Sequence, residues 1–514
     1  ADLPVSLHQN GIELDQRGFI AINPPYGMRL LAHGLDGFYE HLSQGLRELP
    51  DSWSMTVITP DADFDGSVGF EAQRTLPVYN GAIEATLRSY RLGHSNIIEV
   101  PLVTLEGAEV KVAVTSDHAL QFAARLRKMA KARRKWARKN KVHAYRVYDA
   151  DLPDSSAAID LYEGCPQTPG RWLVIAEYAA PKTIDPALAQ ARMLDILAIA
   201  PRILDVPAEH VHAKARMRSR GGSQYGKQGA GKGGSGERAN IARRRLPLIE
   251  EGGLTFAVNF DDYLDVGIFL DHRVTRNLVR EHAKQARRFL NLFAYTGTAT
   301  CYAADGGVEE TVTVDLSNTY LDWAERNMRQ NGFVGPQHHF VRDDVLAWIR
   351  DQRQTRNRWD LIFVDPPTFS NSSKMGRRTW DVQRDHVELL AGVSRLLTQG
   401  GHAIFSCNLR GFRPETRKLA RAGVVLQDIT AQTIPEDFAR NQKVHHCYIV
   451  RRLPIEDAMA EVGFSAEEIA ERVEELRSPK QPAERGVKPQ IGSPTKPQAK
   501  SKKKFYASKP KHRS

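Results

Sequence analysis

The sequence predicts an α/β protein whose largest domain, residues 266 to 455, contains a parallel β-sheet with helices on both faces. Short apolar runs such as "RRFLNLFAY", "ETVTVDLS", "WDLIFVDPP" and "GHAIFSCN" alternate there with helix-like segments such as "NTYLDWAERNMRQN". This alternation is typical of a parallel sheet that is covered on both sides. The 514 residues leave room for further domains, and a hydrophobic content of 41% with 26% charged residues is typical of globular proteins.

Residues 1 to 115 are predicted to form the second half of another α/β domain. The runs "GFIAINPP" and "WSMTVITP" are strand-like, and "YEHLSQGLREL" between them is helix-like. Asn80 and Gly81 join two runs of alternating apolar residues, which is a strong β-hairpin signal.

A basic linker helix is expected at residues 116 to 140. Leu126, Met129, Arg133 and Trp136 recur there at helical spacing, while Lys and Arg occupy most of the other positions. The helix is either a solvated linker with one buried stripe or a contact to the phosphates of RNA.

Residues 141 to 265 predict a small α+β domain that contains the Gly-rich loop "GGSQYGKQGAGKGGSGERAN". Gly229, Gly231 and Gly234 fit a GxGxxG pattern, and residues 226 to 232 nearly fit a P-loop. Neither motif is accepted, because no strand leads into the loop and no helix follows it at once. We expect a flexible loop that could touch RNA.

The charge of the chain points to a polyanionic partner. The net charge is +11 and the pI is near 9.4, and phosphates attract Lys and Arg at long range. Nucleic acid is therefore the expected partner. Residues 456 to 514 are expected to form a short helix and a disordered basic tail, since they are rich in Pro, Ser and Lys and poor in apolar residues.

The cysteines and the apolar runs argue against several classes of protein. The four cysteines have no CxxC spacing, which argues against a disulfide framework and a zinc site. No apolar run approaches the roughly 18 residues of a membrane span, and no signal peptide is visible. We expect a cytoplasmic location, without a membrane or a metal as partner.

Polar residues follow four successive strands of the predicted parallel sheet. Thr296 and Gly297 follow the first strand, Asp315 the second, Asp344 the third and Asp365 the fourth. In such sheets the ligand binds at the carboxyl ends of the strands, where an acidic residue accepts hydrogen bonds from a ribose. A single Asp at a strand end is more often a helix cap, but four in this order predict one ligand crevice.

With these residues the sequence resembles the class I S-adenosylmethionine-dependent methyltransferases, which have a Rossmann-like fold. Its motifs "YRVYDADLP", "EYAAPKTID", "DYLDVGIFLDHR", "FLNLFAYTGTAT", "VDPPTFSNS", "DVQRDH", "RGFR" and "DFARNQKVHHCY" further resemble the bifunctional 23S rRNA guanine methyltransferase family RlmKL. Residues 120 to 453 resemble its RlmK half, which makes N7-methylguanosine. Residues 1 to 115, with "NPPYG", resemble the end of the RlmL half, which makes N2-methylguanosine.

The resemblance implies S-adenosyl-L-methionine as cofactor and 23S rRNA, or a precursor of the large ribosomal subunit, as partner. It implies cofactor-binding roles for Asp271, His272, Arg273, Phe293, Thr296, Gly297, Asp315, Leu316 and Asp344. It implies a base site made of Asp365, Pro366, Pro367 and Phe369. Candidate RNA contacts are Arg410, Arg413, Lys135 and Arg138.

N7 of guanine carries an in-plane lone pair and no proton, so its methylation needs no general base and no covalent intermediate. Catalysis then depends on alignment, which supplies roughly 7 to 11 kcal/mol in well-oriented systems. Acceptors at Asp365 and at the Pro366 and Pro367 carbonyls would surround the base, and Phe369 would stack on it.

The N-terminal segment is expected to carry a remnant N2-guanine site at Asn23, Pro24, Pro25 and Tyr26. Only 18 residues precede this strand, too few for the RNA-binding domain and cofactor-binding strands that open the RlmL half. We therefore expect a truncated RlmL-like segment without N2 activity.

Two alternatives stay open. Cys407, after the fifth strand, could be the nucleophile of a cytosine-C5 methyltransferase, since that reaction needs a thiolate. The chain could also be a non-catalytic RNA-binding factor of ribosome assembly that uses the fold as a scaffold.

Overall fold

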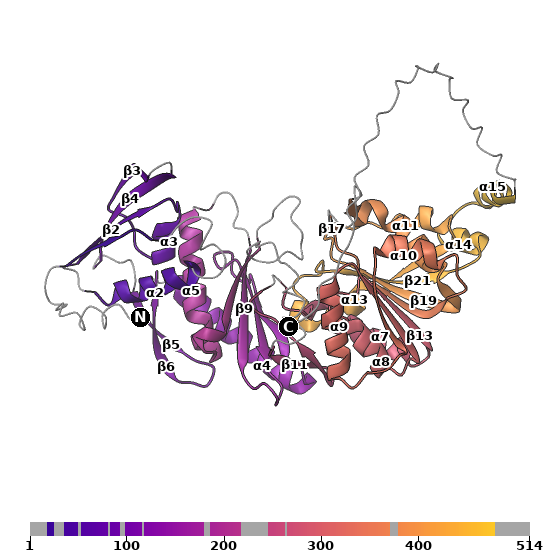
Figure 1. Ribbon diagram of the computed structural model, residues 1–514, viewed down its shortest axis with the longest axis horizontal. Coiled ribbons are helices and arrows are strands. Elements are labelled where there is room, and N and C mark those ends of the chain that lie inside the picture. Colours follow the sequence, from indigo (N-terminus) through magenta and orange to yellow (C-terminus); the bar gives the residue numbers. More distant parts are fainter. Residues whose placement is uncertain are drawn as a thin grey trace, which may run out of the picture.

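In the part of the chain that the structure describes, three β-sheets of four or more strands follow one another along the sequence (Figure 1). A computed structural model describes residues 18–24, 35–49, 53–80, 83–92, 98–115, 118–178, 184, 186–216, 245–262, 265–370 and 379–477. In this part of the chain no helix is both long enough and apolar enough to cross a membrane. The Gly-rich loop and the basic tail lie outside the described residues.

The N-terminal sheet has four strands in the order β1-β2-β4-β3. They span Phe19–Ile22 (β1), Ser54–Thr59 (β2), Arg74–Asn80 (β3) and Ile83–Arg91 (β4). β1 and β2 are parallel, whereas β4 is antiparallel to both β2 and β3. Helices α2 (Leu35–Arg47) and α3 (Phe64–Val68) contribute to a core around Trp53, Met55 and Tyr90. The runs predicted as strands, helix and hairpin are found here.

The middle unit has a second four-stranded sheet in the order β10-β9-β8-β7. Its strands span Ala144–Asp149 (β7), Ala157–Glu163 (β8), Arg171–Tyr178 (β9) and Val211–Arg216 (β10). The basic helix α4 (His118–Asn140), helix α5 (Pro186–Leu204) and the short η1 (Ala208–His210) complete it. Helix α4 buries Phe122 and Leu126 in a core that it shares with α5 and the sheet.

A hairpin of β5 (Ile98–Val103) and β6 (Glu109–Val114) precedes α4. The sequence places this segment with the N-terminal domain. In the structure its buried side chains, including Val100 and Val112, belong to the same core as those of α4 and α5. The hairpin therefore packs with the middle unit, because its apolar face matches the buried stripe of α4.

The third sheet has seven strands in the order β15-β14-β13-β16-β19-β21-β20. They span Arg288–Leu292 (β13), Glu310–Asp315 (β14), His338–Arg342 (β15), Trp359–Val364 (β16), Leu397–Cys407 (β19), Val424–Asp428 (β20) and His446–Arg452 (β21). The first five are parallel, as predicted, and β21 is antiparallel to both β19 and β20. Two separate clusters of buried side chains line the sheet.

Helices and short elements surround this sheet or follow it in the chain. They are η2 (Leu270–His272), α7 (Arg273–Ala283), α8 (Thr298–Asp305), α9 (Asn318–Gln330), α10 (Val345–Gln352), α11 (Val382–Ser394), α12 (Thr416–Ala420), α13 (Thr430–Thr433), η4 (Glu436–Phe438), α14 (Ile455–Glu461) and α15 (Ala466–Arg477). Two small pairs add β11 (Leu248–Glu251) with β12 (Leu254–Ala257), and β17 (Phe369–Ser370) with β18 (Trp380–Asp381).

A buried ion-pair cluster joins the middle unit to the seven-stranded sheet. The Arg273 guanidinium donates from Nη1 to Asp437 Oδ1 at 2.9 Å and from Nη2 to the Ala144 carbonyl at 2.6 Å. Asp437 Oδ2 also accepts from the backbone N–H of Arg146 at 3.0 Å. The Asp437 side chain is 0% exposed, so these bonds satisfy a carboxylate that has lost its water.

Candidate active site

The loop after β13 is a tight turn held by protein contacts. Phe293, Tyr295 and Gly297 all have positive φ angles, of 57°, 51° and 70°. A side chain at Gly297 would place its Cβ atom 2.5 Å from Cβ of Ala324, because α9 approaches closely. Thr296 is buried and its hydroxyl donates to the Gly267 carbonyl at 2.6 Å. The Thr296 side chain therefore fixes the shape of the loop.

Asp315 links this loop to the end of β14. Its Oδ2 atom accepts from the backbone N–H of Tyr295 at 2.9 Å, and its Oδ1 atom accepts from Ser317 at 2.8 Å. The side chain and the following Leu316 are half-buried. Each carboxylate oxygen has a second lone pair, so Asp315 can still accept hydrogen bonds from the hydroxyls of a ligand.

Asp344 begins α10, two residues beyond the end of β15. Its Oδ1 atom accepts from the backbone N–H of Ala347 at 2.9 Å, which makes it the N-cap of the helix. The helix-cap role that such an Asp most often has is therefore present here. Its second carboxylate oxygen remains an acceptor at the same edge of the sheet.

Asp365 lies at the tip of β16, beside the end of β13. Its backbone N–H donates to the Leu292 carbonyl at 3.4 Å. The four strand ends that carry Thr296, Asp315, Asp344 and Asp365 are neighbours in the sheet, because the strand order is β15-β14-β13-β16. The structure thus brings the predicted residues to one edge, as a single crevice requires.

The residues after Asp365 are fixed by β18. Pro366 is buried, and the Pro367 carbonyl accepts from the Trp380 indole N–H at 2.7 Å. Phe369 lies on β17, opposite Asp381 of β18. The Pro367 carbonyl, expected to face a base, therefore already accepts a hydrogen bond from the protein. Its oxygen has a second lone pair that can accept another.

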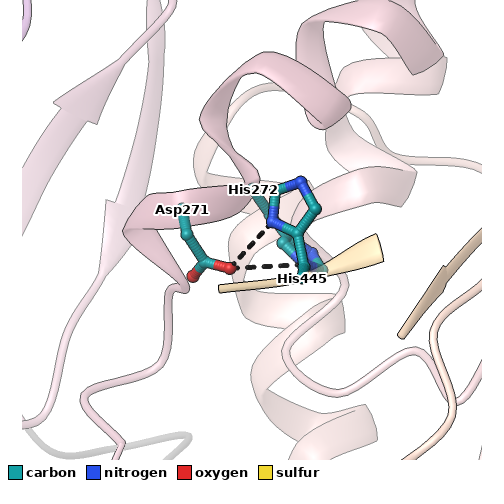
Figure 2. Close-up of side chains that lie close together, drawn as sticks. All are labelled: Asp271, His272 and His445. Atoms are coloured by element: carbon teal, nitrogen blue, oxygen red, sulfur yellow. Dashed lines mark hydrogen bonds and ion pairs between the residues drawn. The ribbon is translucent and has the colours of Figure 1, made fainter. Parts of the chain in front are cut away.

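Figure 2 shows a buried group of side chains, Asp271, His272 and His445, that adjoins Asp365 through His272. Asp271 Oδ2 lies 3.1 Å from His445 Nδ1 and 3.6 Å from His272 Nε2. The other ring nitrogen of His272, Nδ1, lies 3.5 Å from Asp365 Oδ2. The group therefore extends from the tip of β16 to His445, whose side chain is 0% exposed.

This group is complete as a hydrogen-bond network. Its possible metal-ligand atoms lie within 4.8 Å of one another. Both rings nevertheless have a hydroxyl partner in the protein: Ser406 Oγ lies 3.2 Å from His272 Nε2, the nitrogen that also faces Asp271, and Thr433 Oγ1 lies 3.0 Å from His445 Nε2. The expectation that the site holds no metal stays a prediction.

Burial sets the protonation of these groups. Burial, with the nearby Asp271 carboxylate, raises the pKa of Asp365 to about 7, although Arg276 acts against this. Burial lowers the pKa of His272 to about 3, so its ring is neutral at neutral pH. Burial works against the charge of Asp271, but the adjacent His272 and His445 hold its pKa below the usual range. A partly buried carboxyl with a pKa near neutrality is typical of functional sites.

Sequence reasoning did not assign a role to His445, Ser406, Thr433 or Trp380. The motif "DFARNQKVHHCY" contains His445 but gives no spacing to Asp271, which lies 174 residues earlier in the chain. Arg273, expected at the cofactor, has its guanidinium in the ion-pair cluster between the middle unit and the sheet. That contact gives Arg273 a structural role.

The candidate RNA contacts lie on the surface. Arg410 and Arg413 are exposed, and the Arg413 backbone is held by two hydrogen bonds with the Gln383 side chain. Lys135 and Arg138 are exposed near the end of α4. The RNA-binding roles of all four remain predictions.

At the remnant N2-guanine site, Asn23 is exposed and Pro24 is buried, directly after β1. Pro25 and Tyr26 lie outside the described residues.

Cys407 is a poor candidate for a nucleophile. Its side chain is fully buried at the end of β19, and Sγ accepts from the backbone N–H of Leu409 at 3.4 Å. Burial raises the pKa of Cys407 to about 12, so the thiol stays protonated at neutral pH.

Comparison with known proteins identifies the fold. Residues 187–423 match the family model described as S-adenosylmethionine-dependent methyltransferase. The match confirms the predicted methyltransferase fold of the α/β domain, and S-adenosyl-L-methionine is the cofactor of this domain. The acceptors at Asp315 and Asp344 fit it, because carboxylates accept hydrogen bonds from ribose hydroxyls and adenine amines.

Relatives of known name carry a more specific description. The chain is 43% identical over 438 residues to the ribosomal RNA large subunit methyltransferase K/L of Allochromatium vinosum. The aligned residues cover 85% of this chain and 56% of that relative. It is 40% identical over 443 residues to the protein of the same name from Methylococcus capsulatus, covering 84% of this chain and 57% of the relative. The chain thus spans little more than half the length of these relatives. The crystal structure of SMU.776 complexed with SAH is 18% identical, with a TM-score of 0.47 and coverage of 84% of this chain and 99% of that chain.

Proposed function

From the premise that residues 187–423 match the S-adenosylmethionine-dependent methyltransferase family, we propose that this chain methylates N7 of a guanine in 23S rRNA. The observation that carries the proposal is the gathering of Asp315, Asp344 and Asp365 at neighbouring strand ends. The names of the relatives favour large-subunit ribosomal RNA as the substrate.

The cofactor supplies a methyl group on a positively charged sulfur when it is bound. Asp315 would accept hydrogen bonds from its ribose hydroxyls, and Asp344 would accept from its adenine amine. Asp365 accepts from the guanine edge at the tip of β16, and Phe369 offers a stacking face. Arg410 and Arg413, both exposed, contact guanine O6 or the RNA phosphates.

The buried groups favour N7 over a reaction that needs a nucleophile. N7 methylation removes no proton from the base, so the protein has to align the reactants and tolerate the positive charge that develops on the purine. The Asp365 carboxyl can ionise near neutral pH and can balance that charge. Cytosine-C5 methylation would need a thiolate, and burial keeps Cys407 protonated.

The N-terminal sheet supports a second, N2-guanine-like site by its strand pattern alone. Asn23 follows β1 where Asp365 follows β16, and an amide oxygen accepts from the guanine amine. Within the described residues this sheet has no counterparts of β13 to β15, which carry the cofactor loop and acceptors. We therefore expect no N2-methylguanosine from this chain.

Mass spectrometry of the RNA product tests the proposal. The chain is incubated with S-adenosylmethionine and unmodified 23S rRNA, and the nucleosides are then identified. We expect N7-methylguanosine, formed about 100-fold more slowly in Asp365→Asn and at the parent rate in Asp360→Asn, the same change at the other end of β16. Absence of N7-methylguanosine would refute the proposal, and 5-methylcytosine that depends on Cys407 would replace it with the cytosine reaction.

A further inference from the structure

Asp365 lies at the outer end of a row of polar side chains that runs from the tip of β16 through His272 and Asp271 to the buried His445. We propose that Asp365 carries a proton in the free site, stabilised by the His272 ring, and that the site releases this proton when the cationic methyl donor binds. The inference rests on the proposed function in one respect. The methyl group must reach a base held at the tip of β16, which brings the donor's positive charge beside Asp365.

The contacts around Asp271 favour one placement of the hydrogens on His445 and His272 (Figure 2). The Asp271 carboxylate can only accept, so His445 Nδ1 at 3.1 Å from its Oδ2 atom carries hydrogen. His272 Nε2 lies 3.6 Å from the same carboxylate and 3.2 Å from Ser406 Oγ, which can accept, so the negative charge of Asp271 favours hydrogen on this nitrogen too. Because the His272 ring is neutral, its Nδ1 atom then has a free lone pair. That atom lies 3.5 Å from Asp365 Oδ2. A lone pair in this place favours the protonated carboxyl, since an O–H can point to it and a carboxylate would be repelled.

The remaining surroundings of Asp365 also favour the neutral form. The titratable and charged groups that face it are Asp271 and His272 from η2, Arg276 from α7, Cys407 from β19 and Cys447 from β21. The two thiols are uncharged, because burial raises the pKa of each to about 12. The negative charge of Asp271 and the loss of water outweigh the positive charge of Arg276.

The Asp365 carboxyl ionises beside a bound sulfonium because an adjacent positive charge favours the carboxylate. Its side chain is 22% exposed, so the proton can pass to solvent. Methyl transfer leaves a thioether without charge on sulfur and moves the positive charge to the purine, so the carboxyl takes a proton back when the methylated RNA leaves. One proton thus leaves for each donor bound and returns for each methylated RNA released, and the cycle needs no other reactant.

Proton linkage makes donor affinity depend on pH in one direction. The Asp365 pKa is about 7 in the free site and lower with the donor bound, so affinity is full above pH 7 and falls below it. We expect S-adenosylmethionine to bind about tenfold more weakly at pH 6 than at pH 8. S-adenosylhomocysteine, which lacks the sulfonium, should show little of this dependence.

Titration calorimetry with both ligands measures this without RNA. Titrations from pH 5.5 to 8.5, in buffers with different heats of ionisation, give the affinities and the number of protons released. Donor and product share an amino group that also titrates in the upper part of this range. The number of protons released by Asp365→Asn is therefore subtracted from the number released by the parent. We expect the parent to release about 0.8 proton at pH 6.5 on donor binding and Asp365→Asn to release none through this site.

Asp271→Asn tests the role of this row of side chains. Without the carboxylate, His272 is no longer held with its hydrogen on Nε2, and Asp365 also loses a negative neighbour. Both effects favour the Asp365 carboxylate, so the fall in donor affinity should move to lower pH. Asp360→Asn should behave like the parent, and the parent with Asp365→Asn decides the proposal even if Asp271→Asn does not fold.

The outcomes separate this inference from the proposed function. Equal pH dependence for donor and product, or the same proton release in Asp365→Asn as in the parent, would overturn the inference. Proton release on donor binding together with no N7-methylguanosine in the RNA assay would leave the inference standing and refute the proposed function.

Discussion

The N-terminal sheet and the seven-stranded sheet share one pattern and differ in what surrounds it. Strands β1-β2-β4-β3 have the same order and directions as β16-β19-β21-β20. In each set the first two strands are parallel, and the third is antiparallel to both of its neighbours. Each first strand ends in a polar residue before two prolines, Asn23 in one sheet and Asp365 in the other. The same half-sheet thus occurs twice in the chain.

The difference lies beside the first strand. β16 is paired with β13 on its other side, whereas within the described residues β1 is paired only with β2. Asp365 has a buried network behind it, and Asn23 is exposed. A polar residue at a strand tip therefore becomes a site only when neighbouring strands supply a loop, further acceptors and a dry environment. The predictions that follow test this contrast, from the largest expected effect to the smallest.

Arg273→Ala should destabilise the seven-stranded sheet most. The change leaves the fully buried Asp437 carboxylate without its charged partner, which typically costs about 3 to 5 kcal/mol. Thermal or urea unfolding measures the loss. Arg329→Ala, which removes an exposed pair with Glu325 on α9, should cost about 0.5 kcal/mol or less. Equal costs would show that the cluster between the two units does not stabilise the fold.

Asp365→Asn should reduce N7 methylation about 100-fold, because it removes the negative charge that balances a cationic purine. Asn23→Ala, at the matching place in the N-terminal sheet, should leave the rate of N7 methylation unchanged. Single-turnover assays on 23S rRNA compare the two variants. Loss of N7 methylation in Asn23→Ala would mean that the two sheets serve one reaction.

Gly297→Ala should weaken binding of S-adenosylmethionine about tenfold. An added Cβ would lie 2.5 Å from Ala324 and would also sit at a φ of 70°, so the loop beside Asp315 has to move. Gly307→Ala is the matched control, since its φ is 98° but no atom lies within 4 Å of the new Cβ. Calorimetry should show near-parent affinity for Gly307→Ala, and equal losses would assign the effect to backbone strain alone.

Cys407→Ser should have the smallest effect, within about threefold of the parent rate. The side chain is buried and its pKa is about 12, so no thiolate is available to lose. Complete loss of methylation, together with a covalent RNA adduct in the parent, would contradict this expectation.

The sequence predicts the sheet and its strand-end acids well because both depend on local pattern. Apolar runs mark β13, β14 and β16, and the parallel order follows from their alternation with helices. Contacts between distant residues were not predictable in this way. Asp271 meets His445 across 174 positions, and Arg273 meets Asp437 across 164. Likewise, the packing of the β5–β6 hairpin on α4 depends on shape, which no spacing in the sequence encodes.

The hydrogen bond between the Trp380 indole and the Pro367 carbonyl makes the fluorescence of Trp380 sensitive to changes at the site. Trp380 is buried, and its ring centre lies 5.8 Å from that of Phe293 in the loop after β13. Indole emission changes with the polarity and hydrogen bonding around the ring. A ligand that binds against this loop or against residues 365–367 will therefore change the fluorescence of Trp380. The difference in emission between the parent and Trp380→Phe isolates that signal. The fold thus contains an intrinsic optical reporter of occupancy, usable without a label.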